Sequence, residues 1–198
     1  MIKLWFEKLS GTKRDLLSLT GLLNFACKVV RPGRIFLRRM IKLSTTVMEL
    51  KDIIELSDDA KLDMKWWNDF LHQWNGKAIM LRTVEAKVDV QIFTDASLIG
   101  MGGIKNKQWF SVNWPEGWSN MHINVLELFA VATAIIMWLD KYYNCNVLIY
   151  TDNKPIVDIW MTGSTHNKQM MIIIRYCSTF LQRGTLISNC NTFSVTKI

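Results

Sequence analysis

The chain has 198 residues, of which 49% are hydrophobic, so it can bury a core and is not a disordered polypeptide. Its formal net charge is +7, and residues 1–43 carry the whole excess, with ten Lys/Arg against Glu7 and Asp15. A basic segment beside a nearly neutral body predicts a polyanionic partner, either nucleic acid or an anionic membrane surface. A solvated basic arm without a partner would have the same composition.

The cysteines and the apolar runs bear on location. The four cysteines form no CxxC pair and no zinc-binding spacing, which favours a reduced, intracellular protein in the cytoplasm or the nucleus. The first residues lack the apolar region of a signal peptide. The longest uncharged apolar run, Leu128–Leu139, is shorter than the roughly 20 residues of a transmembrane helix. We therefore expect no membrane association, and the sequence does not indicate the oligomeric state.

Residues 13–43 predict two helices, because leucines from Leu16 to Leu23 recur at helical spacing and "RPGR" at 31–34 interrupts the pattern. After this break, basic residues lie one turn apart near one helix face. Together with the break they form the expected contact to a nucleic-acid backbone: Arg31, Arg34, Arg38 and Arg39.

A third helix is predicted to begin after Ser57, an N-cap residue followed by two aspartates in the first turn, and to end near Asn75-Gly76. Aromatic residues at helical spacing are more often packing residues than a binding site. We therefore expect a packing role for Trp66, Trp67 and Trp74.

From about Val88 the pattern changes to strands. "VDVQIFTD" alternates as a strand does, and a hairpin follows with a turn near residues 105–107. Glycines at 100, 102 and 103 fit a sheet edge where a backbone or ligand comes close. Next come a helix over 122–143, a buried strand over 146–152, helices near 154–161 and 167–182, and a short strand near 185–188. The order β-β-β-α-β-α-α-β predicts an α/β fold.

Glu127 lies on the apolar side of the helix over 122–143, whose polar residues cluster on another edge. A glutamate is almost never buried without a partner. A tilted helix that exposes Glu127 to water, or an internal basic partner, would also account for it. Near the start of the same helix, His122 is expected to do no more than shape that start.

Asp95 and Asp152 each follow a threonine at the end of an apolar strand, and the long helix connects the two strands. Such a crossover makes the strands parallel, so both aspartates would emerge at the same sheet edge, which is where open α/β sheets bind ligands. Glu127 on the crossover helix would face them. Close carboxylates require a cation, and oxygen ligands favour Mg²⁺ or Mn²⁺ over zinc. Two such ions can activate water against a phosphodiester.

The motifs "TDAS" at 94–97, "HINVLELFAV" at 122–131 and "TDN" at 151–153 resemble the three acidic blocks of the ribonuclease H domain of retroelement reverse transcriptases. Residues 16–40 resemble the end of the polymerase thumb and connection in DIRS-like (tyrosine-recombinase) and related retrotransposons. Residues 60–77 resemble the linker before their ribonuclease H domain. The resemblance covers nearly the whole chain in order.

The resemblance implies a ribonuclease H-like mixed five-stranded sheet flanked by helices. It also implies that Asp95, Glu127 and Asp152 are metal-binding catalytic acids for two Mg²⁺ or Mn²⁺ ions, and that Ser97 and Asn153 contact nucleic acid. The expected domains are a helical basic segment at 1–45, resembling thumb and connection, a helical linker at 46–86 and a ribonuclease H-like domain at 87–198.

The sequence departs from the family's pattern at two points. The polymerase palm and its YxDD-type block are absent, so we expect no polymerase activity from this chain. No acidic residue or histidine follows His166, although the family supplies a fourth acid there. Two functions therefore stay open. One is a metal-dependent endonuclease that cleaves the RNA strand of RNA–DNA hybrids, recognised by A-form shape. The other is a catalytically impaired nucleic-acid-binding remnant of a reverse transcriptase.

Overall fold

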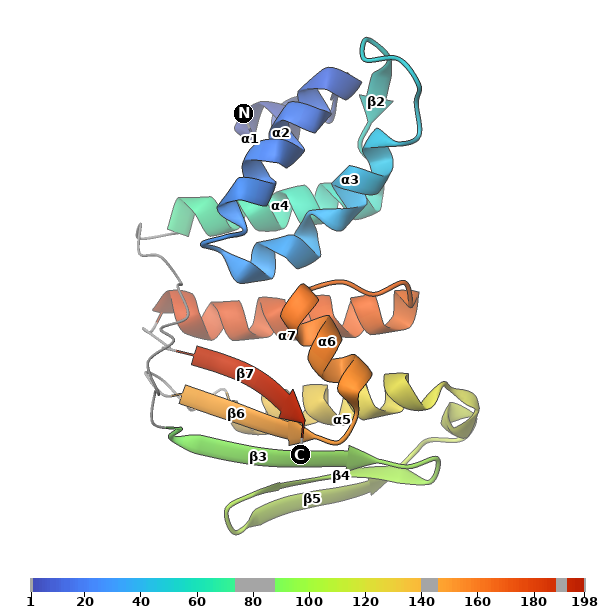
Figure 1. The fold of residues 1–198 in the computed structure, drawn as a ribbon, viewed down its shortest axis with the longest axis vertical. Helices are drawn as coiled ribbons and strands as arrows, with labels where there is room; N and C mark the ends of the chain where they lie inside the picture. The colour runs from blue at the N-terminus through green and yellow to red at the C-terminus, as the bar shows by residue number, and fades with distance from the viewer. Residues whose placement is uncertain (1, 74–87, 140–145, 188–191, 198) are drawn as a thin grey trace. The chain divides into compact units, whose positions relative to one another are not determined.

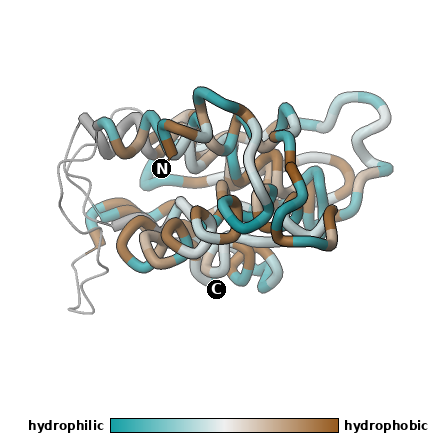
Figure 2. Tube along the Cα trace, turned by 90° about the horizontal axis from the view of Figure 1, so that it is seen from above, coloured by the Kyte–Doolittle hydropathy of each residue, from teal (hydrophilic) through white to brown (hydrophobic). Residues whose placement is uncertain are grey.

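A computed structural model describes residues 2–73, 88–139, 146–187 and 192–197 (Figure 1). The chain divides into two compact units, Met1–Met80 and Leu81–Ile198. Within single elements, hydrophobic and hydrophilic residues interleave along the trace (Figure 2), as expected where one side of a helix or strand is buried and the other is exposed.

The first unit is mainly helical. Thr12 is the N-cap of the helix Lys13–Ala26 and forms a capping box with Asp15, which satisfies the backbone amides of both residues. The elements are α1 (Ile2–Lys8), β1 (Ser10–Thr12), α2 (Lys13–Ala26), the 3₁₀ helix η1 (Arg31–Phe36), α3 (Arg38–Ser44), β2 (Ile53–Glu55) and α4 (Asp58–Gln73). Strands β1 and β2 pair in antiparallel fashion. The two helices predicted within 13–43 are confirmed, and the "RPGR" break forms the first turn of η1.

The aromatic residues of α4 form the core of this unit. Trp66 stacks on Phe36 and Phe70, and Trp67 is fully buried, so the packing role predicted for these tryptophans is confirmed. Gly33 admits the Trp67 ring, which a Cβ at that position would strike. The Ser57 hydroxyl accepts a hydrogen bond from the Ala60 amide at 3.3 Å, as expected of the N-cap. Trp74 and the predicted helix end at Asn75-Gly76 lie outside the described residues.

The second unit contains a mixed five-stranded sheet in the order β5-β4-β3-β6-β7. Strands β3 and β6, and β6 and β7, are parallel, whereas β3, β4 and β5 form an antiparallel meander. The elements are β3 (Val90–Ala96), β4 (Gly100–Lys105), β5 (Gln108–Asn113), the 3₁₀ helix η2 (Trp118–Asn120), α5 (Ile123–Trp138), β6 (Asn146–Thr151), α6 (Lys154–Thr162), α7 (Lys168–Ile187) and β7 (Thr192–Lys197). The predicted fold class and element order are confirmed.

Helix α5 is the central helix of this unit and packs against β3, β4 and α7. Its buried side chains lie on several sides, as its apolar sequence predicts. Leu126 and Ala130 pack against Ala96 of β3, and Trp138 packs against Phe110 of β5. These contacts hold the helix against β3 and β5.

The predicted strand near 185–188 is wrong, because residues through Ile187 belong to α7. A run as short as "TLIS" shows no period of its own, and the helical pattern of buried residues that includes Met170, Ile174 and Cys177 leads into it. The last strand is β7, where Val195 is buried.

The expectation that the glycines mark a sheet edge is also wrong, because β4 pairs with β3 on one side and with β5 on the other. A Cβ at Gly100 would strike the Val112 carbonyl oxygen, and a Cβ at Gly103 would meet the Phe110 ring. These glycines therefore make room for β5 and not for a ligand. Within the described residues, no helix is both long and apolar enough to cross a membrane.

Candidate metal centre

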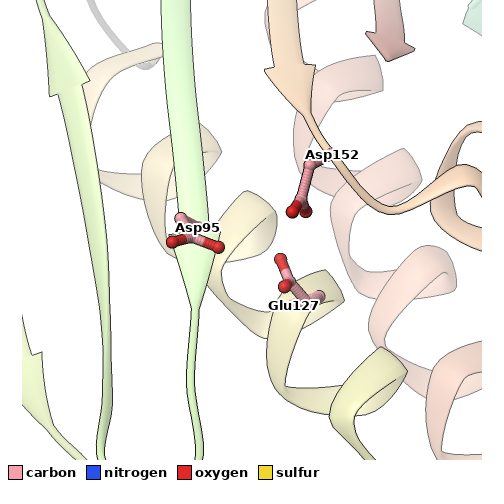
Figure 3. Close-up of side chains that lie close together, drawn as sticks. All are labelled: Asp95, Glu127 and Asp152. Atoms are coloured by element: carbon pink, nitrogen blue, oxygen red, sulfur yellow. The ribbon is translucent and has the colours of Figure 1, made fainter. Parts of the chain in front are cut away.

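Three carboxylates converge at one end of the parallel strand pair. Asp95 belongs to β3, Glu127 to α5, and Asp152 directly follows β6. One oxygen from each side chain lies within 4.8 Å of the others. Figure 3 shows the side chains projecting from these three elements toward a shared space. Residues 32 and 25 positions apart in the chain are thus brought within reach of one cation.

The strand pairing explains why the two aspartates meet. In the parallel register, Phe93 lies opposite Tyr150, so Asp95 and Asp152, each two residues further on, come to the same end of the strand pair. The preceding threonines are buried, and the Thr94 hydroxyl donates a 3.4 Å hydrogen bond to the Tyr150 carbonyl across the two strands. The repeated Thr-Asp pattern therefore combines a buried hydroxyl inside the sheet with an exposed carboxylate at its end.

Glu127 is the buried member of the cluster, with 5% of its surface exposed, whereas Asp95 and Asp152 are exposed. Its Oε2 atom is buried and has no hydrogen-bond partner among the described residues. Burial, together with the charges of Asp95 and Asp152, raises the pKa of Glu127 to about 7, although a hydrogen bond with the Ala96 backbone acts in the opposite direction. A buried oxygen without a donor, facing two more carboxylates, fits a divalent cation with oxygen ligands.

The polar residues beside the acids are tied into the protein. The Asn153 side chain accepts a hydrogen bond from the Ile156 amide at 3.3 Å, as the N-cap of α6, and donates one of 3.0 Å to Asn124 Oδ1. The Ser97 hydroxyl accepts hydrogen bonds from the Ile99 and Gly100 amides and so closes the β3–β4 turn. The nucleic-acid contacts predicted for Ser97 and Asn153 would come from groups that also hold these turns.

The predicted basic contacts lie in the first unit. Arg34 is exposed in η1, whereas Arg38 in α3 is half-buried. Arg39 forms ion pairs with Asp59 at 3.2 Å and with Asp63 at 3.1 Å, so its charge is compensated inside the unit. Arg31 begins η1.

A pocket is lined by residues at and near the starts of α5, α6 and α7, and none of the three acids is among them. His122 is one of them, and its Nδ1 accepts a hydrogen bond from the Asn124 amide, so it caps α5 as predicted. Asn124 both lines the pocket and contacts Asn153. We did not single out Asn124 from the sequence, although its position three residues before Glu127 places it on the same helix face.

No family model and no curated protein sequence matches the chain. Among solved structures, RNase H1 from the halophilic archaeon Halobacterium salinarum is 12% identical, with a TM-score of 0.41, over 55% of this chain and 84% of that protein. The foamy viral protease-reverse transcriptase in complex with dsDNA is 13% identical, with a TM-score of 0.39, over 94% of this chain and 39% of that one. The chain thus spans well under half of the viral protein. Because both TM-scores are low, the function proposed below rests on the geometry of the three carboxylates and not on these two structures.

Proposed function

We propose that this chain is a metal-dependent endonuclease that cleaves the RNA strand of RNA–DNA hybrids as part of a retroelement reverse transcriptase of the DIRS-like or a related group. The observation that carries the proposal is the unpartnered, buried oxygen of Glu127 within 4.8 Å of oxygens of Asp95 and Asp152. Three carboxylates this close repel one another and contribute little to stability on their own, but they form a good ligand set for Mg²⁺ or Mn²⁺.

The three acids would be the ligands of the metal. Asp95 on β3, Glu127 on α5 and Asp152 after β6 would together hold two ions. When bound, two such ions activate a water molecule and stabilise the leaving oxygen of a phosphodiester. The acids hold negative charge at this point, and ionisation of Glu127 is needed before its oxygen can serve as a ligand. Hydrolysis then breaks one P–O bond of the RNA strand and adds water across it.

The basic first unit would contribute backbone contacts without base readout. Arg34 is exposed, so we propose it, with Arg31 and Arg38, as a contact to the phosphates. Arg39 would contribute less, since its partners Asp59 and Asp63 already compensate its charge.

A second function is favoured by the size of the acidic cluster, to which the described residues contribute three carboxylates. A ligand set of three acids would hold one of two ions weakly, which leaves a hybrid-binding domain with little or no cleavage. In that case the acids would still bind a cation, but the bound hybrid would persist.

A labelled RNA–DNA hybrid distinguishes the two functions. Cleavage of the RNA strand with Mn²⁺ or Mg²⁺, absent in EDTA and absent in Asp95→Asn, supports the nuclease. Hybrid binding without cleavage at any concentration of either metal assigns the chain to the binding class. Duplex DNA of the same sequence serves as the control substrate, because hybrid recognition depends on A-form shape and 2′-hydroxyls.

A further inference from the structure

The separation of Asp152 from Glu127 is not fixed by the sheet alone. Asp152 follows the last residue of β6 and is exposed, whereas Glu127 is carried by α5. Strand pairing holds β6 against β3, and the packing of Leu126 and Ala130 on Ala96 places β3 against the first turns of α5. Neither contact involves the residues that directly follow β6, so a link from these residues to the start of α5 bears on the position of Asp152.

Asn153 makes that contact. Its Nδ2 donates a hydrogen bond of 3.0 Å to Oδ1 of Asn124, which lies 29 residues earlier in the chain. Asn153 is the residue next to Asp152, and Asn124 is one helical turn before Glu127. One amide–amide hydrogen bond thus links the immediate neighbour of one acid to the helical turn that carries another.

Asn153 is held by three hydrogen bonds, two of its side chain and one of its backbone amide, so it can transmit this constraint. Its backbone amide donates to the hydroxyl of Thr151, which is fully buried, at 3.2 Å. Its Oδ1 accepts from the Ile156 amide as the N-cap of α6. The link to Asn124 in α5 uses Nδ2, whereas the capping bond uses Oδ1. A substitution can therefore remove the first bond and keep the second.

We propose that Asn153 is a positioning residue for the acidic cluster, with its side-chain amide setting the separation of Asp152 from Glu127 through Asn124. This proposal deepens the proposed function and rests on the same metal centre. It assigns Asn153 a role that acts through neighbours, distinct from direct contact with nucleic acid.

The test uses substitutions that separate the link from the cap. Asn153→Ser keeps a side-chain oxygen that can cap α6 but removes the amide donor. Asn124→Ala removes the acceptor from the opposite side and leaves its backbone amide free to donate to His122. The readout is the dissociation constant for Mn²⁺, measured on the full chain by electron paramagnetic resonance. Tm in EDTA is recorded for every variant, and Ser57→Ala, which removes the α4 cap in the other unit, controls for a general loss of stability.

We expect each single variant to weaken Mn²⁺ binding by about ten-fold, the lower end of the range for residues that orient metal ligands. Because both substitutions remove the same hydrogen bond, the double variant should bind Mn²⁺ within about two-fold of the weaker single one. Ser57→Ala should lower Tm and leave Mn²⁺ affinity unchanged.

The proposal would be overturned if Asn153→Ser bound Mn²⁺ as tightly as the parent. It would also be overturned if the loss of Mn²⁺ affinity in the double variant equalled the product of the losses in the two single variants. A parent chain that binds Mn²⁺ without cleaving a hybrid would refute the nuclease and leave the positioning role intact. A parent chain that binds no Mn²⁺ would overturn both.

Discussion

Replacing Glu127 by glutamine tests whether the carboxylate cluster is held together against its own repulsion. The pKa of Glu127 is raised from 4.5 to about 7, first by burial and then by Asp95 and Asp152. A carboxyl group with a raised folded-state pKa favours the folded chain while it is protonated. Its ionisation therefore destabilises the metal-free fold progressively as pH rises from about 4.5 to about 7. Below this window the penalty is absent, and above it the penalty is complete.

The size of the penalty follows from the shift. A difference of between two and three pKa units corresponds to about 3 kcal/mol, since each unit is worth about 1.4 kcal/mol. Glu127→Gln has nearly the same shape but does not ionise. Its free energy of unfolding in EDTA, relative to the parent, should thus rise by up to about 3 kcal/mol between pH 4.5 and pH 8. Urea unfolding at several pH values measures this difference, and any constant cost of the buried amide cancels from it.

Divalent metal should reverse the order of stability. At pH 8, saturating Mn²⁺ should stabilise the parent, because ligand binding to the folded state adds RT ln(1 + [L]/Kd), whereas Glu127→Gln should gain less. Glu116→Gln makes the same substitution on an exposed side chain and should behave as the parent does. A pH-independent stability difference between Glu127→Gln and the parent would refute the electrostatic reasoning for the site.

Three further predictions concern activity, binding and packing. Asp95→Asn and Asp152→Asn should each abolish detectable hybrid cleavage with Tm near that of the parent, and cleavage equal to the parent's in Asp95→Asn would contradict the metal-site assignment. Arg34→Gln should weaken hybrid binding and make the log–log salt slope shallower by about 0.9 or less, as measured by fluorescence anisotropy, whereas an unchanged slope would remove Arg34 from the contact. Gly100→Ala should lower stability by about 1–3 kcal/mol in urea unfolding, because its Cβ would strike the Val112 carbonyl, and a neutral result would show that β5 can shift freely.

The sequence predicts the strands and the crossover helix because these elements carry their own periodicity. The alternation along β3 and the apolar helix between β3 and β6 are local signals, and the crossover rule converts them into a parallel strand pair. The convergence of Asp95, Glu127 and Asp152 follows from that pair together with the helix face of Glu127. No contact distance was needed to expect it.

Interactions between distant side chains could not be predicted in this way. The sequence around Arg39 contains no acidic residue that could pair with it, because its partners Asp59 and Asp63 come from a different helix. Asn124 and Asn153 carry no sequence signal for their contact, since amide pairs have neither a period nor a charge pattern. The close approach of β5 to the glycines of β4 depends on the register of the hairpin, which the sequence does not reveal. The prediction therefore placed these glycines at a sheet edge.

The energetics of Glu127 bear on the choice between nuclease and remnant. Burying an ionisable group with one oxygen left without a hydrogen-bond partner costs stability, and two neighbouring carboxylates increase that cost. A domain that serves only to bind a nucleic-acid backbone gains nothing from this arrangement. It also loses affinity, because acids facing a polyanion repel it. A bound cation removes both penalties at once, since it neutralises the carboxylates and supplies the missing partner of the Glu127 oxygen. Metal binding, as proposed above, would therefore account for the cluster, and the hybrid assay with and without Mn²⁺ tests whether a bound metal also supports cleavage.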